Sequence, residues 1–127
     1  MPSRDKKTYH FLGGAEEACS IFGIENEKMV RTAIKQKIKG KILAMKQDDF
    51  PIGKNEDYRF VPDHMISSTT MLIWGNKTAI FVWKKPHFAI LIDDEEITKS
   101  NLATFNYLWS IGEKPSNADR KKRKLKG

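Results

Sequence analysis

The chain has 127 residues, of which 39% are hydrophobic and 31% are charged, and its formal net charge is +7. This length suits one domain with one modest core. Cys19 is the only cysteine, which excludes a domain stabilised by intrachain disulfides. No apolar run approaches the roughly 20 residues of a membrane helix, and the N-terminus has no signal-peptide pattern. We therefore expect a cytoplasmic protein with no membrane contact.

The positive charge is concentrated at the C-terminus. Residues 112–127 hold seven of the 23 Lys and Arg residues against two acids. This segment has almost no apolar residues, so it cannot bury enough surface to offset the entropy of ordering. We predict a flexible N-terminus over 1–7, a single domain over 8–111 and a disordered basic tail over 112–127.

The N-terminal half predicts a strand, two helices and a second strand. Tyr, Phe and Leu in Thr8–Leu12 favour a strand. Ala15–Phe22 is a candidate short helix, which we expect to stop at Gly23. Apolar residues three or four apart then predict an amphipathic helix over Glu25–Lys39, followed by a buried strand over Lys41–Met45.

Beyond a polar loop, the apolar period becomes strand-like. Turn-forming residues separate the apolar runs, and the last three runs should form an antiparallel meander. Four strands are predicted, over Tyr58–Val61, Thr69–Trp74, Thr78–Trp83 and Phe88–Ile92.

A final helix is predicted over Glu95–Ile111, because Asp93 and Asp94 supply capping oxygens and first-turn negative charge. Its apolar face should cover the sheet. The order is β-α-α-β-β-β-β-β-α, which indicates an α/β fold of the α+β type with one mixed sheet.

No complete catalytic or metal-binding motif is present. The three histidines, His10, His64 and His87, lie apart from one another and from Cys19, whereas a zinc site needs three or four converging ligands. No phosphate-binding loop, nucleophile elbow or dinucleotide fingerprint occurs. We expect no metal and no cofactor. The acidic run from Asp93 to Glu96 fits a helix start better than a paired-carboxylate site.

Two groups of residues are candidates for packing and binding. Large aromatic residues in amphipathic elements indicate core or dimer-interface positions, namely Trp74, Trp83, Phe105 and Trp109. The basic tail is a candidate nucleic-acid contact through counterion release, although a solubilising tail fits the same composition. The candidate contact residues are Arg120, Lys121, Lys122, Arg123, Lys124 and Lys126.

The stretch from Tyr58 to Trp109 resembles the C-terminal effector domain of TrmB-family transcriptional regulators, which are archaeal and bacterial. The matching segments are Tyr-Arg-Phe-Val-Pro at 58–62, Met-Leu-Ile-Trp-Gly-Asn-Lys-Thr-Ala-Ile at 71–80, Ala-Ile-Leu-Ile-Asp at 89–93 and Phe-Asn-Tyr-Leu-Trp at 105–109. Each segment is short, so the resemblance rests on their order and spacing. The chain differs from those regulators, because it has too few residues before Tyr9 for a winged helix-turn-helix.

The resemblance implies a phospholipase D-like half-domain that is not catalytic. The related enzymes use His-x-Lys-x4-Asp, in which histidine attacks phosphorus and lysine binds the phosphate oxygens. On the first meander strand this spacing falls on Thr69, Met71 and Asn76. On the last strand it falls on His87, Ala89 and Asp94, so the lysine is missing and His87 is only a weak catalytic candidate.

Three hypotheses follow for function. The first is a non-catalytic regulatory or ligand-sensing domain, dimeric through its aromatic surfaces and acting in transcription with DNA or a DNA-binding partner. The second is a small phospholipase D-like phosphodiesterase or nuclease that pairs His87 across a dimer. The third is a nucleic-acid-binding module that uses the basic tail.

Overall fold

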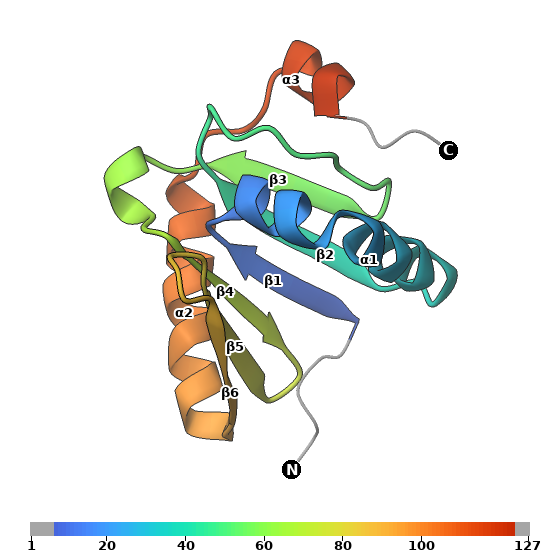
Figure 1. Ribbon diagram of the computed structural model, residues 1–127. Coiled ribbons are helices and arrows are strands. Elements are labelled where there is room, and N and C mark those ends of the chain that lie inside the picture. The colour runs from blue at the N-terminus through green and yellow to red at the C-terminus, as the bar shows by residue number, and fades with distance from the viewer. Residues whose placement is uncertain (1–6, 124–127) are drawn as a thin grey trace.

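The computed structural model describes residues 7–123. One six-stranded sheet lies between helices on its two faces (Figure 1). The strand order is β3-β2-β1-β4-β5-β6. The strands are β1 (Thr8–Leu12), β2 (Lys39–Ala44), β3 (Glu56–Phe60), β4 (Thr69–Trp74), β5 (Lys77–Val82) and β6 (Phe88–Asp93).

The sheet is mixed, as predicted. β1, β2 and β3 are parallel neighbours, whereas β4 pairs antiparallel with β1 and continues into the predicted meander with β5 and β6. The helices are α1 (Ala15–Lys35), α2 (Glu95–Ile111) and α3 (Asn117–Arg123), with a short 3-10 turn η1 (Asp63–Met65). The predicted α+β class is therefore confirmed, and the element order roughly matches the prediction, with α3 as an additional helix.

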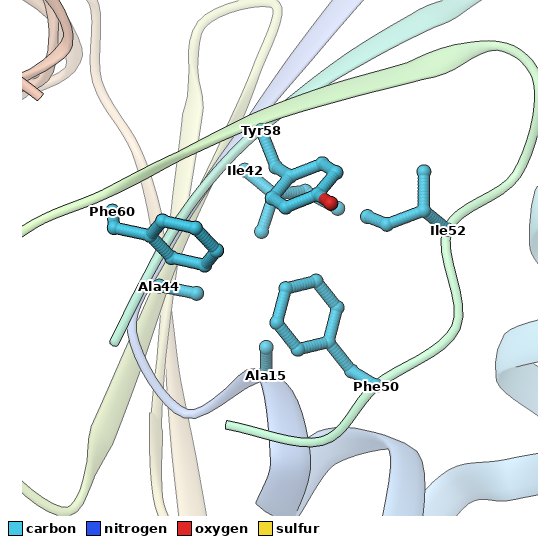
Figure 2. Close-up of a cluster of buried hydrophobic side chains, with 7 residues drawn as sticks. All are labelled: Ala15, Ile42, Ala44, Phe50, Ile52, Tyr58 and Phe60. Atoms are coloured by element: carbon cyan, nitrogen blue, oxygen red, sulfur yellow. The ribbon is translucent and has the colours of Figure 1, made fainter. Parts of the chain in front are cut away.

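The core has two parts, one on each face of the sheet. On the α1 side, side chains from β2, β3 and the loop before β3 meet the first turn of α1, and Figure 2 shows the Phe50 ring facing Tyr58 and Phe60. This cluster contains Ala15, Ile42, Ala44, Phe50, Ile52, Tyr58 and Phe60. On the other side, α2 buries Phe105 and Leu108 against Leu43, Val61 and Ile73.

The region predicted as two helices is the element α1, in which two helical segments meet at a kink. Phe22 has non-helical angles (φ −113°, ψ 26°) inside α1, and the chain continues helically through Gly23. The helix ends at Lys35, earlier than predicted. Ile38 N–H donates to Ala33 O (2.8 Å) and Lys37 N–H donates to Ile34 O (3.2 Å), which is the Schellman pattern of a helix end. Lys37 takes the left-handed position (φ 58°) where glycine is more usual.

The C-terminal segment differs from the predicted disordered tail over residues 112–123. Gly112 follows α2, and Glu113 forms a two-way backbone bridge with Phe60 (both 2.8 Å). The helix α3 then returns to the β3 end of the sheet (Figure 1). Composition alone did not predict this docked segment, because a single buried side chain, that of Arg123, anchors it. Residues 124–127 of the predicted tail, like 1–6 of the predicted flexible N-terminus, lie outside the described residues.

Candidate interaction surfaces

The predicted histidine and acid of the last strand do not form an assembled phosphate site in the described region. His87 is exposed in the loop before β6, with its ring 6.4 Å from that of Trp83. Ala89 stands on β6 where the enzyme pattern has lysine. Asp94 accepts a hydrogen bond from Ile97 N–H (2.9 Å) as the N-cap of α2. The acid therefore has a structural role, as its position at a helix start predicts.

The equivalent spacing on β4 lacks reactive groups as well. Thr69 and Met71 lie within the strand and Asn76 lies in the turn that follows it. Within residues 7–123, no three His, Cys, Asp or Glu side chains are grouped to hold a metal ion. No helix in this range is long and apolar enough to span a membrane.

The C-terminal basic residues have different environments. Arg123 is 3% exposed and its NH2 group donates to Lys46 O (3.0 Å) and Asp48 O (2.7 Å). Its guanidinium also lies over the rings of Phe50, Tyr58 and Phe60, with centroid distances of 5.1, 5.8 and 5.3 Å. Arg123 is therefore an anchor, and it is not accessible to a phosphate.

The other residues of α3 are more open. Arg120 forms an exposed ion pair with Asp57 (3.2 Å), whereas Lys121 and Lys122 are exposed. Lys124 and Lys126 lie outside the described residues. Docking by Arg123 thus presents a short row of lysines at the β3 end of the sheet, where positive charge is available to an acidic partner.

The four predicted aromatic residues also separate into buried and open positions. Phe105 is fully buried, and Trp109 stacks on it with 6.1 Å between ring centroids. Trp83 is 8% exposed and its indole N–H donates to Thr70 Oγ1 (2.8 Å). Trp74, by contrast, is 40% exposed at the end of β4.

Trp74 belongs to an apolar surface that sequence reasoning did not locate. On the α1 side, α1 packs mainly on β2, and the β4–β6 part of the sheet is less covered (Figure 1). We call this surface the open face, defined by Leu72, Trp74, Phe81 and Leu91 of the sheet with Phe22 and Met29 of α1. The signal for it was present, because β6 has no alternation of polar and apolar residues.

Two shallow grooves run between α1 and the open face. One of about 350 Å³ is lined by Tyr9, Met29, Leu72 and Trp74 among others, and one of about 230 Å³ is lined by Phe22, Met29, Leu72 and Phe81 among others. Both have almost wholly apolar walls. A sugar, which needs several converging hydrogen-bonding groups, does not match such walls.

A half-buried polar pair lies beside the larger groove. Tyr9 Oη donates to Glu56 Oε2 (2.6 Å), and Gly53 N–H donates to Glu56 Oε1 (2.9 Å). Burial raises the pKa of the Glu56 carboxyl, and burial together with the Glu56 charge raises the pKa of Tyr9. This pair joins the β1 and β3 parts of the sheet across Gly40 of β2, which leaves room for the Tyr9 ring.

These features define a mixed α+β domain with an open apolar face and a basic C-terminal helix. Among solved structures, it is similar to TrmBL2, an archaeal chromatin protein whose structure shows a novel mode of DNA binding. The TM-score is 0.59 at 14% sequence identity, and the match covers 87% of this chain and 46% of that one. The two proteins share a fold, and this chain spans somewhat under half the length of TrmBL2. No protein-family profile and no curated protein sequence matches the chain.

Proposed function

We propose that this chain is a non-catalytic regulatory domain of the TrmB effector type, which self-associates and acts in transcription or chromatin together with DNA. The observation that carries the proposal is the fold shared with TrmBL2 over 87% of the chain. The motif resemblance over Tyr58–Trp109 supports the same relationship, and with it a phospholipase D-like ancestry. The open face supports self-association, because exposed apolar patches on soluble domains mark interaction sites.

The absence of catalysis is supported by the surroundings of His87. A histidine nucleophile in phosphoryl transfer needs a cation to stabilise the developing charge, and Ala89 cannot supply one. Asp94 is also committed to the N-cap of α2. The residues of the enzyme pattern thus have other roles or lack the required chemistry.

A phosphodiesterase assay tests this part of the proposal. The purified chain and its His87→Ala variant are incubated with bis(p-nitrophenyl) phosphate and with single-stranded DNA, in the presence of a metal chelator. We expect the same background rate for both proteins. Cleavage by the wild type that disappears in His87→Ala would identify a phosphodiesterase instead.

Direct nucleic-acid contact through α3 is a second candidate function. The observation in its favour is that Lys121 and Lys122 are exposed while Arg123 holds the helix in place. Two lysines that neutralise two phosphates contribute roughly 2 to the slope of log affinity against log salt concentration. The short row of lysines would then add affinity without sequence preference.

A salt titration with a short fluorescent duplex tests this candidate. We expect Lys121→Glu/Lys122→Glu to weaken binding and to lower the magnitude of the salt slope by about 2. The matched control is Lys28→Glu/Lys35→Glu, which makes the same charge change on the exposed surface of α1. Equal losses in both double variants would indicate that net charge alone controls binding.

Effector sensing, the remaining part of the regulatory proposal, is best matched by the larger of the two apolar grooves. This groove of about 350 Å³ beside α1 has an apolar lining that suits an apolar effector. Because Trp74 lines it, binding should shift tryptophan emission. The same titration on Trp74→Phe should lose that shift, and an unchanged shift would place the effector elsewhere.

A further inference from the structure

The strand β6 is an unprotected edge of the sheet. It ends the strand order, and Figure 1 shows it at the opposite end from β3 and α3. Five consecutive uncharged apolar residues, Phe88–Ile92, form most of this strand, and Phe88, Ile90 and Leu91 are 54%, 47% and 66% exposed. Edge strands of monomers normally carry charges, prolines or bulges that prevent pairing with another chain.

The opposite edge has such protection. β3 contains Glu56, Asp57 and Arg59, and its last residue is bridged by Glu113. The helix α3 then docks beside it through Arg123. The fold therefore covers one edge and leaves the more apolar one uncovered, which is the arrangement expected if the second edge pairs with another strand.

The direction of the free backbone groups on β6 can be deduced. Asp94 N–H donates to Asn76 O (3.2 Å), on the β5 side. Because backbone groups alternate between the two sides of a strand, the even-numbered residues of β6 bond to β5. The N–H and C=O groups of Ala89 and Leu91 therefore point to the open edge.

We propose that β6 pairs antiparallel with β6 of a second copy of this chain, with Ile90 on the two-fold axis. This inference rests on the self-association in the proposed function and names its surface. In this register Ala89 lies opposite the partner's Leu91, so the outward-pointing groups of both copies form hydrogen-bonded pairs. Ile90 lies opposite the partner's Ile90 as a non-hydrogen-bonded pair, whose side chains approach most closely.

The charge pattern around β6 matches this register. Lys84, Lys85 and His87 precede the apolar segment, and an acidic run that begins at Asp93 follows it. Antiparallel pairing centred on Ile90 places His87 opposite the partner's Asp93 and brings the two lysines alongside the partner's acidic run. A parallel arrangement would bring like charges together. Exposed pairs contribute little affinity, so their role is to select orientation and register.

In the joined sheet, the equivalent faces of the two copies would lie on the same side. Ala89 and Leu91 project to the side of the open face, because they pair with Phe81 and Ala79 of β5. The two-fold axis therefore brings both open faces to the same side of one continuous sheet. Ile90 projects to the α2 side with Thr78, whose hydroxyl contacts Thr98 of α2 (3.1 Å). Both sides of the junction are thus apolar.

Sedimentation equilibrium with the full chain tests whether the β6 edge forms the dimer interface. We expect the wild type to dimerise and Ile90→Glu to raise the dimer dissociation constant ~100-fold, because two buried isoleucines are lost and two like charges meet at the axis. The matched control is Ile111→Glu, at the end of α2, where the side chain is 57% exposed. It should leave the dissociation constant unchanged. Circular dichroism checks that both variants are folded.

Cysteine cross-linking tests the register independently. In a Cys19→Ser background, Ile90→Cys places two sulfurs across a non-hydrogen-bonded pair with Cα atoms ~4.5 Å apart, which is within disulfide range. We expect near-complete covalent dimer on mild oxidation, and little for Leu91→Cys or Ile111→Cys. A dimer that survives Ile90→Glu and gives no Ile90→Cys cross-link would overturn this inference while leaving self-association intact. A wild type that is monomeric at all concentrations would overturn both.

Discussion

Trp83 donates its indole N–H to Thr70 Oγ1 (2.8 Å), and both groups are buried. The Thr70 hydroxyl donates in turn to Gly13 O (2.8 Å). This chain of hydrogen bonds joins the end of β5 and the strand β4 to the turn before α1. It therefore fixes where α1 begins relative to the open face. Trp83 also stacks on Phe81, with 5.6 Å between ring centroids, at the wall of the smaller groove.

Gly14→Ala should destabilise the protein through this hydrogen-bond chain. Gly14 is at φ +64°, and an added Cβ would clash with Thr70 Oγ1 and lie 2.6 Å from Trp83 Nε1. The left-handed backbone costs about 1 kcal/mol for alanine and the clash a further 1–3 kcal/mol or so. We expect a loss of roughly 2–4 kcal/mol in urea unfolding, with a shift in Trp83 emission. A loss below about 1 kcal/mol would show that the junction can rearrange freely.

Gly23→Ala should have the opposite effect. Gly23 lies inside α1, and a Cβ there meets no atom within 4 Å. Alanine loses less backbone entropy in a helix, so we expect a gain of roughly 0.5–1 kcal/mol in the free energy of unfolding. Circular dichroism should show no loss of helix. Destabilisation would mean that the kink at Phe22 depends on the glycine.

Arg123→Ala should release α3 from the sheet. The substitution removes two hydrogen bonds to carbonyl groups and the cation–π contacts to three rings, for an expected loss of roughly 2–4 kcal/mol. Ile52 N–H donates to Arg123 O, so its hydrogen exchange should accelerate along with the loss of stability. Arg123→Lys should rescue little, because an ammonium cannot reproduce the planar guanidinium.

The matched control for the anchor is Lys122→Ala. Lys122 is exposed on the same helix, so its removal should change stability by no more than about 0.5 kcal/mol. Equal effects of Arg123→Ala and Lys122→Ala would contradict the anchor.

The sequence predicted the elements that depend on local pattern and missed those that depend on distant contacts. The six strands and α2 followed from strand-favouring residues, apolar runs, turn residues and the capping position of Asp94. The docking of α3 did not, because Arg123 is stabilised by rings some sixty or more residues earlier in the chain. Charge content alone made this arginine a phosphate-contact candidate, whereas its burial depends on the loop before β3.

The candidate surface was predicted only in part for a related reason. Trp74 and Trp83 cannot be distinguished by residue type, yet the Trp74 side chain is exposed and the Trp83 side chain is buried beside Thr70. The difference depends on where α1 lies across the sheet. The exposed β6 edge, by contrast, could have been inferred from Phe88–Ile92, in which five apolar residues stand between a basic and an acidic run.

The Tyr9–Glu56 pair gives a prediction for pH dependence. Burial raises the pKa of Glu56 above its ordinary value of 4.5. A carboxyl with a raised pKa in the folded state contributes its full stability below the unfolded-state pKa. That contribution is lost as pH rises through the folded-state value, because the buried group must then ionise. The wild type should therefore lose stability relative to Glu56→Gln as pH increases.

Urea unfolding of both proteins between about pH 4 and pH 7 measures this difference. The neutral amide of Glu56→Gln can accept from Tyr9 or from Gly53 N–H but not from both, which lowers its stability by an amount that does not depend on pH, while the ionisation is removed. Asp48, whose pKa burial also raises, is present in both proteins and cancels in the comparison. The stability of Glu56→Gln minus that of the wild type should grow with pH and then level off. Parallel curves would show that Glu56 titrates alike in the folded and unfolded chains.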